Sequence, residues 1–163
     1  RWPRVGRVVA PLVVAAICAR GLLSTNVQLS QLIRNGATSA WTDAIFPLSD
    51  YVSPVRAERY ALLDWGMSSP LRLLHRGRLH LEWAADQLTA AEATDQTRAA
   101  FRRMAEAPGR VYIMHTAPFE IFTGVNARLA ELLAGEGFRK QPLAVIPDSH
   151  GREVFEVFRI ATD

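Results

Sequence analysis

The chain has 163 residues, of which 49% are hydrophobic and 21% charged, a size and composition typical of one globular domain with a buried core. Nine Pro and ten Gly without a repeating period exclude a collagen-like chain, and the apolar content excludes an intrinsically disordered one. The net charge is +3, and the basic residues are all arginine except Lys140. Because no basic run with interleaved aromatic residues occurs, we do not expect the protein to bind nucleic acid.

The cysteine and histidine residues do not form a metal-binding pattern. Cys18 is the single cysteine, which excludes an intrachain disulfide and a cysteine zinc site, and its apolar neighbours predict a buried, unreactive thiol. The four histidines lack the spacing of metal ligands: His75, His80, His115 and His150. No Gly-rich phosphate loop is present either. We therefore expect neither a metal nor a cofactor.

Residues 1–35 differ from the rest of the chain. Val8 to Ala19 contains no charged residue and no polar face, and three arginines precede it. A helix over Val5 to Leu23 would reach about 28 Å, close to the roughly 30 Å hydrocarbon core of a bilayer. The pattern favours a transmembrane helix, with a buried core helix and a secretory signal peptide as alternatives. From Ser24 the chain continues as an amphipathic helix or as an extension of the same helix, ending at Gly36.

The arginines at the start of this segment predict its orientation. By the positive-inside rule they place the beginning of the span in the cytoplasm, although Arg20 on the far side is a countersignal. Residues after about 24 would then be extracytoplasmic, at the surface of the cell membrane. We expect two parts, a membrane helix with its extension in residues 1–35 and an extracytoplasmic α/β domain in residues 36–163, with membrane lipid as a partner.

A second helix is expected to begin near Thr38 or Ser39 and to run through Val52, with a possible kink at Pro47. Its aromatic residues can be explained in two ways, because rings at this spacing occur in cores and also at membrane interfaces. They are Trp41, Phe46 and Tyr51.

The remaining sequence alternates between apolar runs and helical patterns. Strands are expected at 59–65, 78–83 and 110–116, and a hairpin at 138–147 and 153–161. Helices are expected from Ser68 or Ser69 to Gly77, over 86–107 and over 126–136. This order predicts an α/β fold with a small mixed sheet, parallel central strands, helices on both faces and a C-terminal antiparallel hairpin.

Polar residues follow two of the predicted strands. Asp64 and Trp65 end the first strand, and His115 and Thr116 end the third. Because open α/β sheets place ligands at the carboxyl ends of their strands, these residues and the nearby Glu120 form a candidate ligand surface for a sugar or a lipid-phosphate headgroup. The alternative is structural: Asp64 would cap the helix beginning near Ser68 or Pro70, and His115 would be hydrogen-bonded in the core. No residue is assigned a catalytic role.

Several segments together resemble a known family. They are the apolar helix, the stretch WTDAIFPLSDYV, a strand ending in DWG, a strand ending in VYIMHT and the terminal hairpin DSHGREVFEVFRI. In this order they resemble the C-terminal extracytoplasmic region of bacterial integral-membrane glycosyltransferases similar to dolichyl-phosphate-mannose protein mannosyltransferases.

The resemblance implies a function for the chain. Members of the family use lipid-linked sugars, and their catalytic acidic residue lies in the first extracytoplasmic loop, which nothing in this chain matches. The resemblance therefore implies a non-catalytic domain, inactive alone, that frames an acceptor or contacts a partner, with a polyprenyl-phosphate sugar handled through other parts of the protein. One alternative is a membrane-anchored α/β binding or interaction domain without transferase activity. Another is a soluble α/β enzyme whose first helix belongs to its core.

Overall fold

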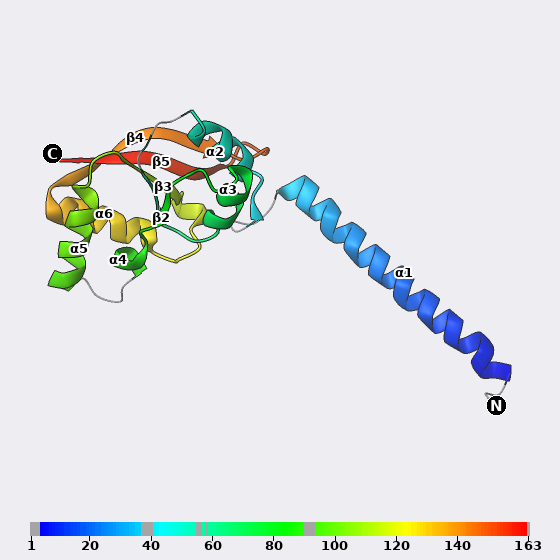
Figure 1. Cartoon of the computed structure of the whole chain (residues 1–163). Coiled ribbons are helices and arrows are strands. Elements are labelled where there is room, and N and C mark those ends of the chain that lie inside the picture. Colours follow the sequence, from blue (N-terminus) through cyan, green and yellow to red (C-terminus); the bar gives the residue numbers. More distant parts are fainter. Residues whose placement is uncertain (1–3, 37–40, 55–56, 58, 90–93, 163) are drawn as a thin grey trace. The chain divides into compact units, whose positions relative to one another are not determined.

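The computed structural model describes residues 4–36, 41–54, 57, 59–89 and 94–162. The chain divides into two compact units, Arg1–Gly36 and Ala37–Asp163. The first contains the single helix α1, and the second contains a five-stranded sheet with helices (Figure 1). The expected α/β class, with parallel central strands and a terminal antiparallel hairpin, is confirmed.

Helix α1 extends without interruption over Arg4–Asn35, so the polar residues after Leu23 extend the apolar helix rather than begin a second one. Pro11 lies inside it, and Gly36 follows it with a positive φ of 71°. Residues Val8–Asn35 are long and apolar enough to cross a membrane, and none of the most apolar window is buried within the protein. Cys18 is accordingly exposed, which corrects the prediction of a buried thiol.

The sheet has the strand order β2-β1-β3-β5-β4. Its strands are β1 (Arg59–Leu62), β2 (Leu81–Trp83), β3 (Arg110–His115), β4 (Phe138–Pro147) and β5 (Glu153–Thr162). β1 pairs with β2 and β3 in parallel, whereas β5 pairs with β3 and β4 in antiparallel orientation. The hairpin of β4 and β5 thus closes one side of the sheet, next to the parallel strands that carry the candidate residues.

Helices cover both faces of the sheet (Figure 1). On one face lie α4 (Asp86–Thr89), α5 (Asp95–Ala105) and α6 (Val125–Glu136), which bury Phe101, Met104 and a row of leucines against Tyr112. On the other face lie α2 (Ile45–Val52) and α3 (Ser68–Leu74), which bury Leu48 and Leu71 against Ile113. Alternation along the strands explains this division, because successive side chains of a strand point to opposite faces.

Several boundaries differ from the sequence prediction. β1 ends at Leu62, because Leu63 N donates the last ladder bond to Ile113 O and the chain then turns. β2 begins only at Leu81, because the short strand β1 pairs with it only from Tyr60 to Leu62. The helix expected near Thr38 or Ser39 begins at Ile45, with residues 37–40 outside the described part, and Pro47 lies in its first turn, where no kink is needed.

The helical segments also differ in detail. Neither Ser68 nor Ser69 caps α3: Met67 is its N-cap residue, makes no side-chain cap bond and is buried, so apolar burial fixes this helix start. The helix expected over 86–107 is two helices, α4 and α5. Thr94 starts the second because its Oγ1 accepts a hydrogen bond from Thr97 N at 3.2 Å. Gly137, with φ 74°, ends α6.

Candidate functional site

The register of β1 and β3 brings Asp64 and His115 together. Leu62 pairs with Ile113 across these parallel strands, and both side chains lie in the core beneath α2 and α3. Two residues further along each strand, Asp64 and His115 therefore reach the same edge and the same face of the sheet. The His115 Nδ1 to Asp64 Oδ2 distance is 2.8 Å, and both residues are 1% exposed. The two strand ends therefore meet, as the sequence predicted.

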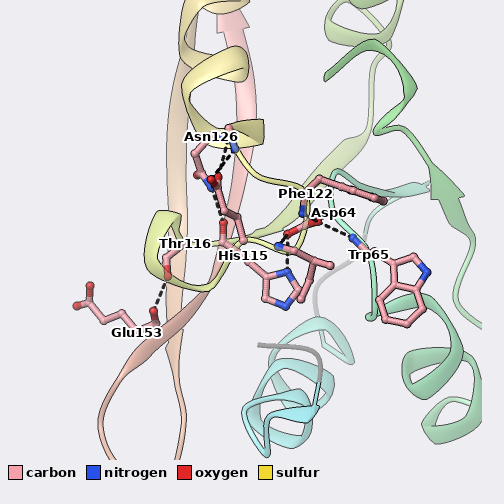
Figure 2. A network of polar contacts seen from close by, with 10 residues as sticks. Asp64, Trp65, His115, Thr116, Phe122, Asn126 and Glu153 are labelled. Atoms are coloured by element: carbon pink, nitrogen blue, oxygen red, sulfur yellow. Dashed lines mark hydrogen bonds and ion pairs between the residues drawn. The ribbon is translucent and has the colours of Figure 1, made fainter. Parts of the chain in front are cut away.

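Asp64 accepts four hydrogen bonds (Figure 2). Oδ2 accepts from His115 Nδ1 and from Ile121 N at 2.8 Å, and Oδ1 accepts from Trp65 N at 2.8 Å and from Phe122 N at 3.2 Å. Desolvation by burial alone would raise the pKa of Asp64, but the His115 bond and the three backbone bonds outweigh it and leave the pKa below its usual value. Asp64 is thus an ionised carboxylate that ties the loop after β3 to the end of β1.

Asp64 therefore has a structural role, but a different one from the expected alternative. It does not cap α3, whose N-cap is Met67, and its four hydrogen bonds go to other residues. Its partners instead lie in the segment between β3 and α6, which is far from it in sequence. The second half of the alternative is correct, since His115 is hydrogen-bonded and buried.

The ring of His115 is fixed from two sides. Its Nδ1 faces Asp64, and its ring centroid lies 4.7 Å from that of Phe155 on β5. In Figure 2 the other ring nitrogen, Nε2, points away from Asp64, and no hydrogen bond joins it to any of the described residues. Because a carboxylate can only accept, the proton of the neutral ring resides on Nδ1 and the lone pair on Nε2.

His115 lines a cavity of about 580 Å³ at the carboxyl ends of the parallel strands. Its walls are mostly apolar and aromatic. They come from α2 and the segment before it, from the β1–α3 connection and the first turn of α3, and from β2, β3 and β5. The lining residues are Trp41, Thr42, Ile45, Phe46, Asp64, Trp65, Gly66, Ser68, Ser69, Pro70, Trp83, His115 and Phe155. A cavity of this size with a few polar groups is typical of a small-molecule site.

The three tryptophans that line the cavity are partly exposed to solvent. Trp41 is 79% exposed, Trp65 53% and Trp83 43%, although all three line the cavity. Phe46 beside them is also exposed. These rings are therefore available to a ligand. Of the two explanations offered for the aromatic residues, burial in the core does not hold for Trp41 and Phe46, whereas Tyr51 is half-buried against the core.

Thr116 and Glu120 do not line the cavity. The Thr116 hydroxyl donates to Glu153 O at 2.6 Å and so fixes β5 to the end of β3. Glu120 accepts from Gly124 N at 2.6 Å and from Asn126 N and Nδ2, so its carboxylate satisfies the first turn of α6. Burial alone would raise the pKa of Glu120, but these bonds lower it below its usual value. Both residues support the loop that Asp64 holds.

Other features of the site could not be identified from the sequence. Phe46 and Trp83 were assigned to no ligand site. Trp83 is the last residue of the predicted strand 78–83, so its position at a strand end was a usable signal, whereas only the folded chain brings Phe46 to the cavity. The backbone N–H groups of Ile121 and Phe122 carry no signal in their side chains. Among the described residues, no group of three or more His, Cys, Asp or Glu side chains is placed to hold a metal ion.

In comparisons with known proteins, no family model, no curated protein and no solved structure matches this chain. A function must therefore be argued from the membrane-type helix and from the cavity at the sheet edge.

Proposed function

We propose that the chain is a non-catalytic, extracytoplasmic C-terminal domain of an integral-membrane glycosyltransferase that uses a polyprenyl-phosphate-linked sugar. In this role α1 anchors the domain, and the cavity beside His115 holds part of a sugar-bearing acceptor or carrier. The donor would be handled by parts of the protein other than this chain.

The observation that carries the proposal is the aromatic cavity at the carboxyl edge of the parallel strands, in a chain that also has a membrane-type helix. Exposed tryptophan rings provide flat faces for sugar rings, and the strand ends are where α/β sheets bind ligands. The family resemblance of the helix, the strand endings and the hairpin supports the same assignment.

Charge supports the proposed orientation. Arg1, Arg4 and Arg7 precede the apolar segment, and the positive-inside rule retains such residues on the cytoplasmic side. The sheet domain, after Gly36, would then lie outside the cytoplasm, where enzymes that use polyprenyl-phosphate sugars meet their acceptors.

The absence of catalytic machinery is also part of the proposal. His115 has one buried carboxylate beside it, and that carboxylate is fully occupied by four donors. Two carboxyl groups flanking a glycosidic bond, the usual arrangement for cleaving one, do not line the cavity, since Asp64 is the single acidic residue among the described lining residues.

The test is a transfer assay with the full chain in lipid nanodiscs. The chain is given a polyprenyl-phosphate sugar and a mixture of candidate acceptors, and we expect no transfer. The open reading frame that encodes these residues is then expressed, and its product should transfer sugar from the same donor. Measurable transfer by the chain alone would overturn the non-catalytic assignment.

The second candidate function is a membrane-anchored binding domain without any transferase. The cavity favours it as much as the first, because a ligand site needs no attached enzyme. The reading frame distinguishes the two: several further apolar spans before Arg1 support the transferase, and a frame with Val5 to Leu23 as its single span supports the binding domain.

A further inference from the structure

We infer that the cavity selects an uncharged, hydroxyl-bearing ring, a sugar rather than a phosphate group, and that Nε2 of His115 accepts a hydrogen bond from a hydroxyl of this ligand. The inference rests on the proposed function in one respect, that the cavity is a binding site. It adds the chemistry of the ligand and the atom that recognises it.

The first argument is the hydrogen-bonding capacity of His115. The ionised Asp64 carboxylate cannot donate a proton, so in the neutral form of the His115 ring the proton lies on Nδ1 and the lone pair on Nε2. His115 lines the cavity, and among the described residues no protein donor bonds to Nε2. Nε2 can therefore accept a hydrogen bond from a ligand in the cavity, and a sugar hydroxyl is such a donor.

The second argument is charge. Among the described residues that line the cavity there is no lysine or arginine, and the one acidic group is the Asp64 carboxylate, whose pKa lies below its usual value. A phosphate bound here would face this negative charge in a region of low dielectric constant without a lysine or arginine to balance it. Phosphate sites commonly use such basic side chains.

The third argument is the shape and composition of the walls. Trp65, Trp41 and Phe46 present exposed aromatic rings around the opening, and the Ser68 and Ser69 side chains provide hydroxyl groups among them. A sugar ring combines apolar C–H faces with hydroxyl edges, so it can cover an aromatic ring and still donate to His115. A purely apolar ligand would leave Nε2 without a partner.

The experiment is a binding titration of the full chain in phosphatidylcholine nanodiscs. Three of the four tryptophans line the cavity, so intrinsic fluorescence reports its occupancy. The probes are methyl glycosides of several hexoses and pentoses, inorganic phosphate and dodecyl phosphate. We expect at least one methyl glycoside to saturate the signal, and neither phosphate to do so.

Two variants connect the binding to the cavity. His115→Asn keeps a donor toward Asp64 and removes Nε2, and we expect it to weaken glycoside binding about fivefold to tenfold, as for one lost hydrogen bond. Trp65→Ala removes a half-exposed wall and should weaken binding without lowering the thermal midpoint, so it tests the site even if His115→Asn does not fold. The matched control is His75→Asn, because His75 bonds to Ser49 outside the cavity, and its affinity should equal that of the parent.

Saturable phosphate binding, or glycoside binding that neither His115→Asn nor Trp65→Ala weakens, would overturn the inference. Failure of every glycoside to bind would overturn it as well. These results would remove the sugar-binding role of the cavity, whereas the assignment to a membrane glycosyltransferase is tested separately by the reading frame and the transfer assay.

Discussion

Replacing Asp64 by asparagine perturbs the structure where the end of β1 is tied to the loop after β3. Each carboxylate oxygen accepts two hydrogen bonds, at least one of them from a backbone N–H group, so either placement of the asparagine NH₂ group sets it against a backbone donor. At least one bond to a charged acceptor is lost. At about 1.5 to 3 kcal/mol for such a bond, the expected loss is about 1.5 to 3 kcal/mol.

The assay is thermal unfolding of the full chain in detergent micelles, followed by near-ultraviolet circular dichroism, which reports the aromatic residues of the sheet domain. For a domain of this size we expect Asp64→Asn to lower the midpoint by at least about 5 °C. The control is Asp86→Asn: Asp86 is exposed and accepts one bond from Trp83 Nε1, which an amide oxygen also accepts, so the midpoint should hardly change. A midpoint for Asp64→Asn equal to that of Asp86→Asn would refute the reasoning.

Three further predictions concern the core, the anchor and the response to acid. Phe101→Ala should lower the free energy of unfolding by about 3 to 5 kcal/mol in denaturant titrations, because this buried ring packs edge-on against Phe138 in the core. Glu120→Gln should lower it by about 1 kcal/mol, because the amide caps the first turn of α6 less well than the carboxylate. The double variant Val13→Arg, Ile17→Arg should appear in the soluble or aggregated fraction after carbonate washing, with the parent chain retained in membranes, because each arginine costs about 3 kcal/mol at the centre of a span. The pKa of Asp64 is lower in the folded than in the unfolded protein, so the ionised carboxylate stabilises the fold fully above the unfolded pKa, near 3.8. This stabilisation is lost as the pH falls through the folded pKa. The free energy of unfolding, measured across that pH window, should therefore fall for the parent and change less for Asp64→Asn.

Much of the fold could be predicted because local patterns and tertiary packing agree. The alternation of strand and helix signals predicted the mixed sheet, and the short Gly-containing connection predicted the hairpin. Errors occurred where packing outweighed a local signal. Ser68 and Ser69 are good caps by residue type, but burial of Met67 set the start of α3. A continuous helical pattern over 86–107 also hid the new start at Thr94.

The candidate site was predictable only in part. Two polar residues at equivalent ends of parallel strands indicated that Asp64 and His115 meet, and the hydrogen bond between them lies at that place. The role of Asp64 as an acceptor for two backbone N–H groups in a distant loop depends on how that loop folds, and no residue type in the loop signals it. Glu120 was placed on the ligand surface by its nearness in sequence, but it lies against the first turn of α6.

The most direct test of the ligand site is ¹⁵N nuclear magnetic resonance of the His115 imidazole in the full chain, labelled at histidine and embedded in nanodiscs. The His115→Asn variant identifies its resonances among those of the other three histidines. At neutral pH we expect a proton on Nδ1, an unprotonated Nε2, and an Nε2 resonance that moves when a binding methyl glycoside is added and stays in place with inorganic phosphate. A ring protonated on Nε2, or an Nε2 resonance that no glycoside moves, would contradict the assignment of this cavity as a site for an uncharged sugar.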